Sequence, residues 1–139
     1  MLSAEVEITA HFYDLDPMNV VWHGNYPRFL EQARCALLDR IGYGYTHMSK
    51  SGYAWPIVDL HIKYVRPVRM AEQIIVNARL VEYEHRLKID YRIRRKQDNE
   101  VLTKAQSVQV AVCMATGELM LESPPELIAK VQAATCAAA

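Results

Sequence analysis

The segment HFYDLDPMNVVWHGNYPRFLEQAR, residues 11–34, connects a strand pattern to a helix pattern. Apolar residues alternate over residues 5–13, which is the period of a half-buried strand. After Asn25, apolar and aromatic residues recur at helical spacing as far as Ile41, which predicts a helix with one buried face. The loop between them, residues 14–24, holds two acidic residues, a proline and a Trp-His pair. It is the first candidate for a functional site.

The rest of the chain has the patterns of four more strands and a second helix. Turn-forming sequences separate the strands. The prolines that follow Ser123 suit the first turn of a short C-terminal helix, with Ser123 as its N-cap. The strands are expected at residues 56–64, 73–83, 86–95 and 101–114, and the small residues 134–139 are expected to fray.

This order of elements predicts an α+β fold with one domain over residues 1–139. The four later strands are expected to form an antiparallel meander, and the first strand makes the sheet five-stranded. One five-turn helix is the only large element that can cover the apolar face of the sheet, so the sheet should wrap around it. The other sheet face and the edge strand would then need a second subunit.

The global composition excludes several classes of function. The 16 basic and 16 acidic residues cancel, which gives no indication of binding to nucleic acid or to an anionic membrane. No apolar run is long enough to span a bilayer, and no signal peptide is visible. Three cysteines without a metal-binding spacing indicate a reducing compartment. We therefore expect a cytoplasmic protein with no metal ion and no cofactor.

The segment YDLDPMNVVWHGNY, residues 13–26, and the EQAR that follows resemble the hotdog-fold acyl-thioesterases of the 4-hydroxybenzoyl-CoA thioesterase type. The family pattern is an aromatic residue, an Asp-x-Asp pair, a glycine or asparagine, a valine and a tyrosine, and then a helix with an acidic-x-Ala-Arg segment. The matching residues are Tyr13, Asp14, Asp16, Asn19, Val21, Tyr26 and Glu31 to Arg34. YVRP, residues 64–67, matches a further aromatic-x-x-Pro of the family. The resemblance covers essentially the whole chain and implies a single hotdog domain.

The resemblance implies that the chain is a thioester hydrolase in which Asp16 acts as nucleophile or general base. It places the principal oxyanion donor at the backbone N–H of His23, helped by Gly24. The unsatisfied N–H groups of a helix N-terminus attract negative charge at such a position. Asp14 is interpreted as a structural turn residue. Asp16 lies too far before Asn25 to cap the helix, which favours a role in the chemistry.

Four further residues are candidates for substrate binding, and each has a structural alternative. They are Asn19, Trp22, Tyr26 and Glu31. Asn19 could instead shape the loop, and Trp22 could lie at a subunit contact. Tyr26 could be a packing residue of the helix and Glu31 a solvated one. Because another branch of hotdog thioesterases uses a glutamate on the central helix, Glu31 is also the fallback carboxylate.

The resemblance implies acyl-CoA or an acyl carrier protein as the substrate. In relatives, a basic cluster between two of the later strands meets the CoA phosphates. This chain has EYEHRLK there, with His85, Arg86 and Lys88 as candidates and two glutamates that dilute the charge. The alternative is an acidic carrier protein docked on RIRRK, residues 92–96, which could equally be a solvated strand end.

Two other functions of hotdog proteins stay open, a non-catalytic acyl-binding protein and an acyl dehydratase or hydratase. The dehydratases use a histidine in an HFPxxP context, and HFYDLDP at residues 11–17 matches only its first two letters. Burying a carboxylate such as Asp16 beside an acyl chain costs free energy, because the charge loses its contact with water. A protein that only binds the acyl chain has no need of this carboxylate, which disfavours the non-catalytic alternative. The architecture predicts a homo-oligomer with an acyl channel between protomers, a dimer at least and a tetramer made of two dimers.

Overall fold

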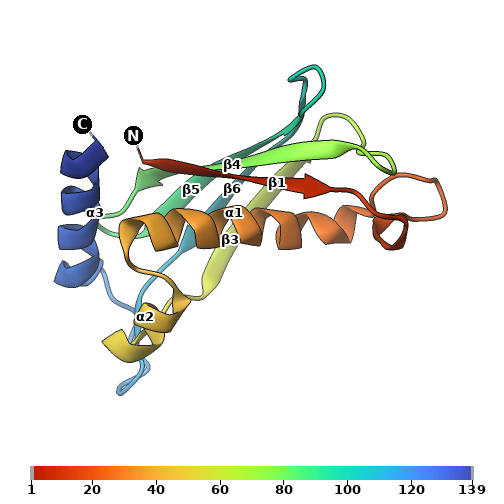
Figure 1. Ribbon diagram of the computed structural model, residues 1–139. Coiled ribbons are helices and arrows are strands. Elements are labelled where there is room, and N and C mark those ends of the chain that lie inside the picture. The colour runs from red at the N-terminus through yellow and green to blue at the C-terminus, as the bar shows by residue number, and fades with distance from the viewer. Residues whose placement is uncertain (1, 139) are drawn as a thin grey trace.

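The computed structural model describes residues 2–138 and has an antiparallel sheet wrapped around one long helix (Figure 1). Two short 3-10 turns, Phe12–Asp14 and His23–Asn25, shape the loop that leads into this helix. The predicted α+β fold class is confirmed. The strands are β1 (Ser3–Thr9), β2 (Tyr53–Ala54), β3 (Ile57–Tyr64), β4 (Gln73–Glu82), β5 (Leu87–Arg95), β6 (Val101–Gln109) and β7 (Val112–Cys113). The helices are α1 (Tyr26–Ile41), α2 (Tyr45–Ser51) and α3 (Pro125–Ala138).

The five long strands follow one another across the sheet in the order β1-β4-β5-β6-β3. Hairpins join β4, β5 and β6, as the turn sequences predict. The expected four-strand meander is wrong, because β3 pairs with β6 and not with β4. The loop of residues 65–72 is long enough to carry the chain across the sheet, and a proline within it prevents a tight hairpin. The two edges of the sheet are therefore β1 and β3.

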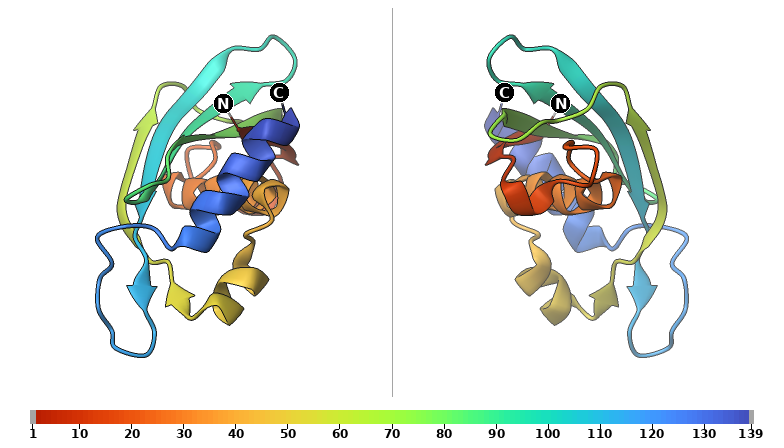
Figure 2. Two further views of the ribbon diagram at one scale, coloured as in Figure 1. Left: turned by 90° about the vertical axis from the view of Figure 1, so that its left-hand side faces the viewer. Right: turned by 90° about the vertical axis from the view of Figure 1, so that its right-hand side faces the viewer.

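The core lies between α1 and the concave face of the sheet. Leu30, Ala33 and Leu37 recur at helical spacing on α1 and are almost completely buried. Across from them, alternate residues of β5 from Leu87 to Ile93 are buried, as a strand with one covered face requires. Figure 2 shows from both ends how the sheet curves around α1. The apolar residues whose spacing predicted the helix and the strands thus lie on the two faces that pack against one another.

The C-terminal helix α3 lies beside the end of α1, where the chain turns toward α2 (Figure 1). It begins at Pro125, so Ser123 is not its N-cap. The Ser123 hydroxyl is instead buried without a hydrogen-bond partner among residues 2–138. Residues 134–138, for which the sequence predicts fraying, continue α3, and Ala139 lies outside the described residues.

Candidate active site

Asp14 holds together the loop that precedes α1. Its side chain is buried, and one carboxylate oxygen accepts a hydrogen bond of 2.9 Å from the N–H of His11. The other oxygen forms an ion pair of 2.8 Å with Arg28 on α1. The backbone carbonyl of Asp14 accepts hydrogen bonds from the side chain of Asn25 and from the N–H of Trp22. These contacts agree with the structural role expected for Asp14.

We predict that Asp14→Ala lowers the free energy of unfolding by about 2 kcal/mol, because it leaves the part-buried N–H of His11 without its acceptor and removes the ion pair. Urea unfolding at one fixed protein concentration measures this change. Asp16→Ala is the matched control and should cost less than about 1 kcal/mol, because Asp16 is only half-buried. Equal unfolding midpoints for the two variants would contradict the structural role of Asp14.

Asp16 occupies the first position of a tight turn. Its N–H donates to the carbonyl of Val20 over 2.9 Å, and its carbonyl accepts from the N–H of Asn19 over 2.9 Å. One carboxylate oxygen accepts from the N–H of Met18 over 2.8 Å. The other oxygen has no hydrogen-bond donor among residues 2–138. Asp16 is therefore fixed by its backbone and by one oxygen, and the second oxygen is available to a substrate or to water.

Asn19 gives this turn its shape. Its φ of 62° lies in the left-handed region, which asparagine adopts more easily than most residues. The side chain is exposed to solvent. The loop-shaping alternative for Asn19 accounts for this geometry.

A hollow of about 250 Å³ opens beside Asp16. Its walls are largely apolar and come from the loop before α1, from the first residue of α1, and from the last residue of β3 with the chain that follows it. Among the lining residues are Asp16, Val21, His23, Tyr26, Tyr64 and Arg66. The fold thus brings a carboxylate, a histidine and an arginine to one small cavity.

Tyr26 and Tyr64 form an aromatic wall of this cavity. Their rings meet edge to face with centroids 4.8 Å apart, and the Tyr64 hydroxyl donates to the carbonyl of His23 over 2.9 Å. Tyr26 is 2% exposed, and this burial raises the pKa of its hydroxyl. Tyr26 is therefore at once a packing residue of α1 and a lining residue of the cavity.

The backbone N–H groups of His23 and Gly24 have no acceptor among residues 2–138. They open the 3-10 turn that runs directly into α1, and the next N–H, that of Asn25, donates to Trp22. Unpaired N–H groups at such a start carry partial positive charge and bind anions. The predicted oxyanion donors are therefore free to bind a developing negative charge.

Trp22 packs over Gly24 and is half-exposed beside His23. The Trp22 and His23 rings lie 5.4 Å apart between centroids. A Cβ atom added to Gly24 would overlap the indole ring of Trp22. Only glycine therefore fits under Trp22 in this conformation.

Glu31 lies away from the cavity beside Asp16. Its half-exposed side chain pairs with Arg34 over 3.5 Å and lines a different hollow of about 460 Å³ on the outer side of α1. Within one chain, the structure does not bring Glu31 together with Asp16. The solvated alternative accounts for this placement.

His85, Arg86 and Lys88 lie at the other end of the sheet from Asp16. The turn between β4 and β5 carries His85 and Arg86, and Lys88 lies at the start of β5. This turn is on the side of α3, whereas the loop of residues 10–25 is at the opposite end of α1 (Figure 1). Arg86 also forms an ion pair of 3.0 Å with Glu82. A single chain therefore does not place this basic cluster beside Asp16.

Much of the basic run at residues 92–96 is neutralised within the chain. Arg94 pairs with Glu5 over 2.7 Å, and Lys96 pairs with Glu7 over 2.8 Å. Arg95 has three carboxylate partners. Arg92 alone of the three arginines makes no ion pair within residues 2–138.

Tyr64 and Arg66 are cavity residues that the sequence did not assign to the site. Both belong to the YVRP segment, residues 64–67, which matches an aromatic-x-x-Pro of the family. The sequence feature that could have identified them is an aromatic and a basic residue beside a proline at the end of a predicted strand. Only the crossover from β3 to β4 places this segment against the Asp16 turn, through pairing of Val20 with Arg69.

Comparison with known proteins gives the chain its relatives. The Thioesterase-like superfamily matches residues 10–134. YneP of Bacillus subtilis (strain 168), named as a candidate acyl-CoA thioesterase, is 34% identical over 77 residues, which cover 55% of this chain and 56% of YneP. The acyl-acyl carrier protein thioesterase ATL3 of Arabidopsis thaliana is 28% identical over 107 residues, which cover 76% of this chain and 56% of ATL3. The chain thus spans about half the length of these two relatives.

A solved structure matches over the full chain. The DHNA-CoA thioesterase from Staphylococcus aureus has a TM-score of 0.83 and 26% identity, and the match covers 100% of this chain and 97% of that one. An aspartate-to-asparagine mutant of 4-hydroxybenzoyl CoA thioesterase in complex with 4-hydroxybenzoyl CoA has a TM-score of 0.81 at 18% identity, covering 94% and 99% of the two chains. The predicted hotdog fold is confirmed. With the profile match over residues 10–134, these findings show that the chain belongs to the thioesterase-like superfamily.

Proposed function

We propose that the protein hydrolyses acyl thioesters to a free acid and a thiol. The observation that carries the proposal is the cavity shared by Asp16 and His23, into which a carboxylate with one free oxygen and the start of α1 both open. A thioester carbonyl held there would have a nucleophile or base on one side and N–H donors on the other. Such preorganised donors stabilise the oxyanion of acyl transfer.

Two routes use the same groups. In the first, the free oxygen of Asp16 attacks the carbonyl carbon, the thiolate leaves, and water then hydrolyses the acyl-aspartyl anhydride. In the second, Asp16 takes a proton from water, the resulting hydroxide attacks, and the thiolate leaves with a proton. In both, the N–H groups of His23 and Gly24 would bind the tetrahedral oxyanion. The proposal covers both routes, since each requires Asp16.

We propose acyl-CoA or an acyl carrier protein as the donor, by analogy with the names of YneP, the DHNA-CoA thioesterase and ATL3. The acyl group would pack against the aromatic wall formed by Tyr26 and Tyr64, with Trp22 at the rim. Aromatic side chains provide large apolar contacts for aryl or unsaturated acyl groups.

A panel of thioesters tests the proposed function. Aromatic, short, medium and long acyl groups would be offered on CoA, on pantetheine and on a carrier protein, with free thiol as the readout. Hydrolysis of at least one class, lost in Asp16→Asn, supports the proposal. Binding of acyl thioesters without release of thiol would show a non-catalytic acyl-binding protein instead.

We also propose that the protein is a homo-oligomer, a dimer at least and a tetramer made of two dimers. The support is β3, an edge strand whose outer edge is unpaired in the single chain. Leu60 and Tyr64 of β3 are 39% and 46% exposed, although they pair with Ser107 and Thr103, two buried residues of β6. An exposed apolar edge strand pairs readily with a second copy. A neighbouring chain is also the only way for His85, Arg86 and Lys88 to approach an Asp16 cavity.

We predict that light scattering gives a mass of at least twice the 15.9 kDa of the chain. Leu60→Asp should shift the protein toward the monomer, because it places a charge on the edge that would be paired. His61→Asp, on the other face of β3, is the matched control. A stable and active species near the mass of one chain would contradict the oligomer.

A reducing compartment such as the cytoplasm is also part of the proposal. Cys35, Cys113 and Cys136 are all free thiols. Within residues 2–138, no helix combines the length and the apolar run that crossing a membrane would require.

A further inference from the structure

The chain between β3 and β4, residues 65–72, is held by backbone hydrogen bonds, and its first three residues line the Asp16 cavity. The N–H groups of Val65 and Arg66 both donate to the carbonyl of Leu102, over 3.0 and 2.9 Å. The carbonyl of Val68 accepts from the N–H of Val21 over 2.8 Å, and Val68 itself is fully buried. Side chains on this segment therefore start from a fixed backbone.

Arg66 is the cationic member of the cavity lining. Its Nε pairs with one oxygen of Glu100 over 2.5 Å, while the side chain remains 63% exposed. Glu100 occupies one edge of the guanidinium, so the terminal nitrogens keep donors free for a second acceptor. Arg66 is thus both oriented by a carboxylate and open to an anion from solvent.

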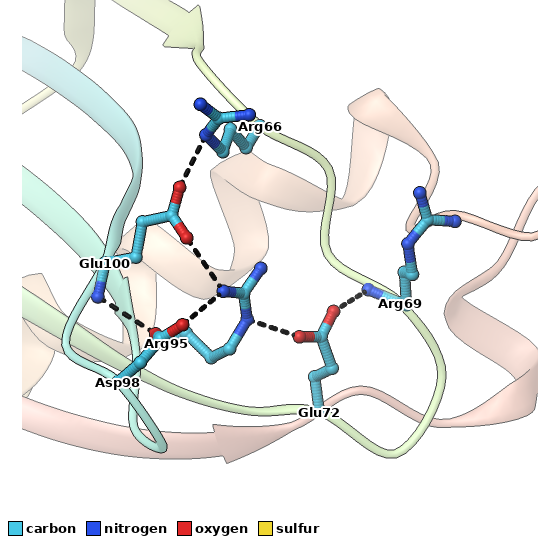
Figure 3. Close-up of polar contacts among 6 residues, drawn as sticks. All are labelled: Arg66, Arg69, Glu72, Arg95, Asp98 and Glu100. Carbon is cyan, nitrogen blue, oxygen red and sulfur yellow. Dashed lines mark hydrogen bonds and ion pairs between the residues drawn. The ribbon is translucent and has the colours of Figure 1, made fainter.

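Arg69 is the second cation on this segment. Glu72, the nearest acidic residue along the chain, uses one oxygen to accept the backbone N–H of Arg69 over 2.6 Å and the other to accept Nε of Arg95 over 2.5 Å. Figure 3 shows the Arg69 guanidinium pointing away from this network. No carboxylate of residues 2–138 pairs with it. The charge of Arg69 is therefore available to a ligand.

Arg95 explains why the nearby acids leave Arg69 unpaired and give Arg66 only one partner. It binds Glu72, Asp98 and Glu100 at 2.5, 2.8 and 3.0 Å (Figure 3). The hydrogen bonds that Arg95 donates to Glu72, and then those to Asp98 and Glu100, hold the pKa of Arg95 above its ordinary value. The three carboxylates are thus bound to Arg95, and only Glu100 also reaches Arg66.

We infer that Arg66 and Arg69 bind phosphate groups of the thiol carrier while the thioester lies at Asp16. This inference rests on the proposed function and names the carrier-binding side of the same site. The guanidinium group suits phosphate because its planar N–H donors match two phosphate oxygens. Arg66 lines the cavity and Arg69 pairs with Val20 of its wall, so a carrier arm that leaves the cavity along residues 65–72 would pass both arginines. Both CoA and the phosphopantetheine of a carrier protein supply phosphate there.

The test uses Arg66→Gln, Arg69→Gln and the double variant, with one acyl group offered on CoA, on carrier protein and on pantetheine, which has no phosphate. We expect KM for acyl-CoA to rise about tenfold for each arginine, with kcat within about twofold. Contacts far from the carbonyl contribute binding equally in the ground and transition states, so they act on KM. Kinetics with acyl-pantetheine should not change.

The matched control is Lys63→Gln with Lys104→Gln, which also removes two positive charges. These lysines line a different hollow, of about 300 Å³, on the outer face of the sheet. The control should leave the acyl-CoA kinetics unchanged, which separates a local phosphate site from the net charge of the protein.

The carriers distinguish the source of the phosphate. A rise in KM confined to acyl-CoA supports the inference with CoA as the ligand, and a rise confined to acyl carrier protein supports it with the phosphodiester of the carrier. Equal changes for pantetheine and phosphate-bearing substrates, or no change for any of them, overturn the inference. If the unmodified protein hydrolyses neither acyl-pantetheine nor any other thioester, the proposed function itself is wrong. This result would be seen before any arginine is changed, so it is distinguishable from a failure of the inference.

Discussion

Asp16→Asn should keep the fold and lower the rate of thioester hydrolysis by about 10³-fold or more, which corresponds to roughly 4 kcal/mol of transition-state stabilisation. The amide has nearly the same shape as the carboxylate, and its oxygen can still accept the N–H of Met18, so the turn should persist. It can neither attack a carbonyl nor take a proton from water. Both kcat and kcat/KM should therefore fall together, as measured with the best substrate of the thioester panel.

Asp59→Asn is the matched control for this variant, since Asp59 is an exposed residue of β3 outside the Asp16 cavity. Unfolding curves of both variants should coincide with that of the unmodified protein within about 1 kcal/mol. Near-normal turnover by Asp16→Asn would move the chemistry to another carboxylate. Glu31 would then be tested first, and in that case it would have to act across a subunit contact.

Gly24→Ala should reduce kcat by about 10²-fold, because the added methyl group overlaps the Trp22 indole and one of the two must move. The backbone of Trp22 is held by the hydrogen bond from its N–H to the carbonyl of Asp14, and its ring lies beside that of His23. We expect part of the displacement to fall on the 3-10 turn that carries the N–H groups of His23 and Gly24. A shift of these donors removes stabilisation that exists only in the transition state, so KM should change little.

A double mutant separates displacement of the donors from general damage. Trp22→Ala creates room for the methyl group, so Trp22→Ala with Gly24→Ala should be no slower than Trp22→Ala alone. Such non-additivity is expected when two residues are coupled by contact. Additive losses in the double mutant would mean that Trp22 does not transmit the effect of the Gly24 change.

The sequence predicted the positions of the helices and strands along the chain better than it predicted the order of the strands in the sheet. The period of apolar residues is a local property, and it located α1 and all five long strands. Strand order depends on where a loop carries the chain, which periodicity does not report. Residues 65–72 could have closed a hairpin or crossed the sheet, and the structure has the crossing.

The same distinction applies to the candidate site. The family resemblance assigned Asp16, His23 and Gly24, and all three lie in the one segment that leads into α1. Tyr64 and Arg66 reach the cavity only through the crossing of β3, about forty residues later. The cluster around Arg86 was expected near the substrate, but a turn sequence does not reveal at which end of the sheet it lies.

The position of β1 and β3 at the two edges of the sheet also has a consequence for synthesis on the ribosome. Both strands, and α1 between them, are made before the strands β4 and β6 with which they pair. The residues from Gln73 to Gln109 complete those partners, which takes roughly 2 to 7 seconds at usual elongation rates. During this interval the apolar stripe of α1 has no sheet to cover it, so the nascent chain is a ready client for chaperones until β6 has left the exit tunnel.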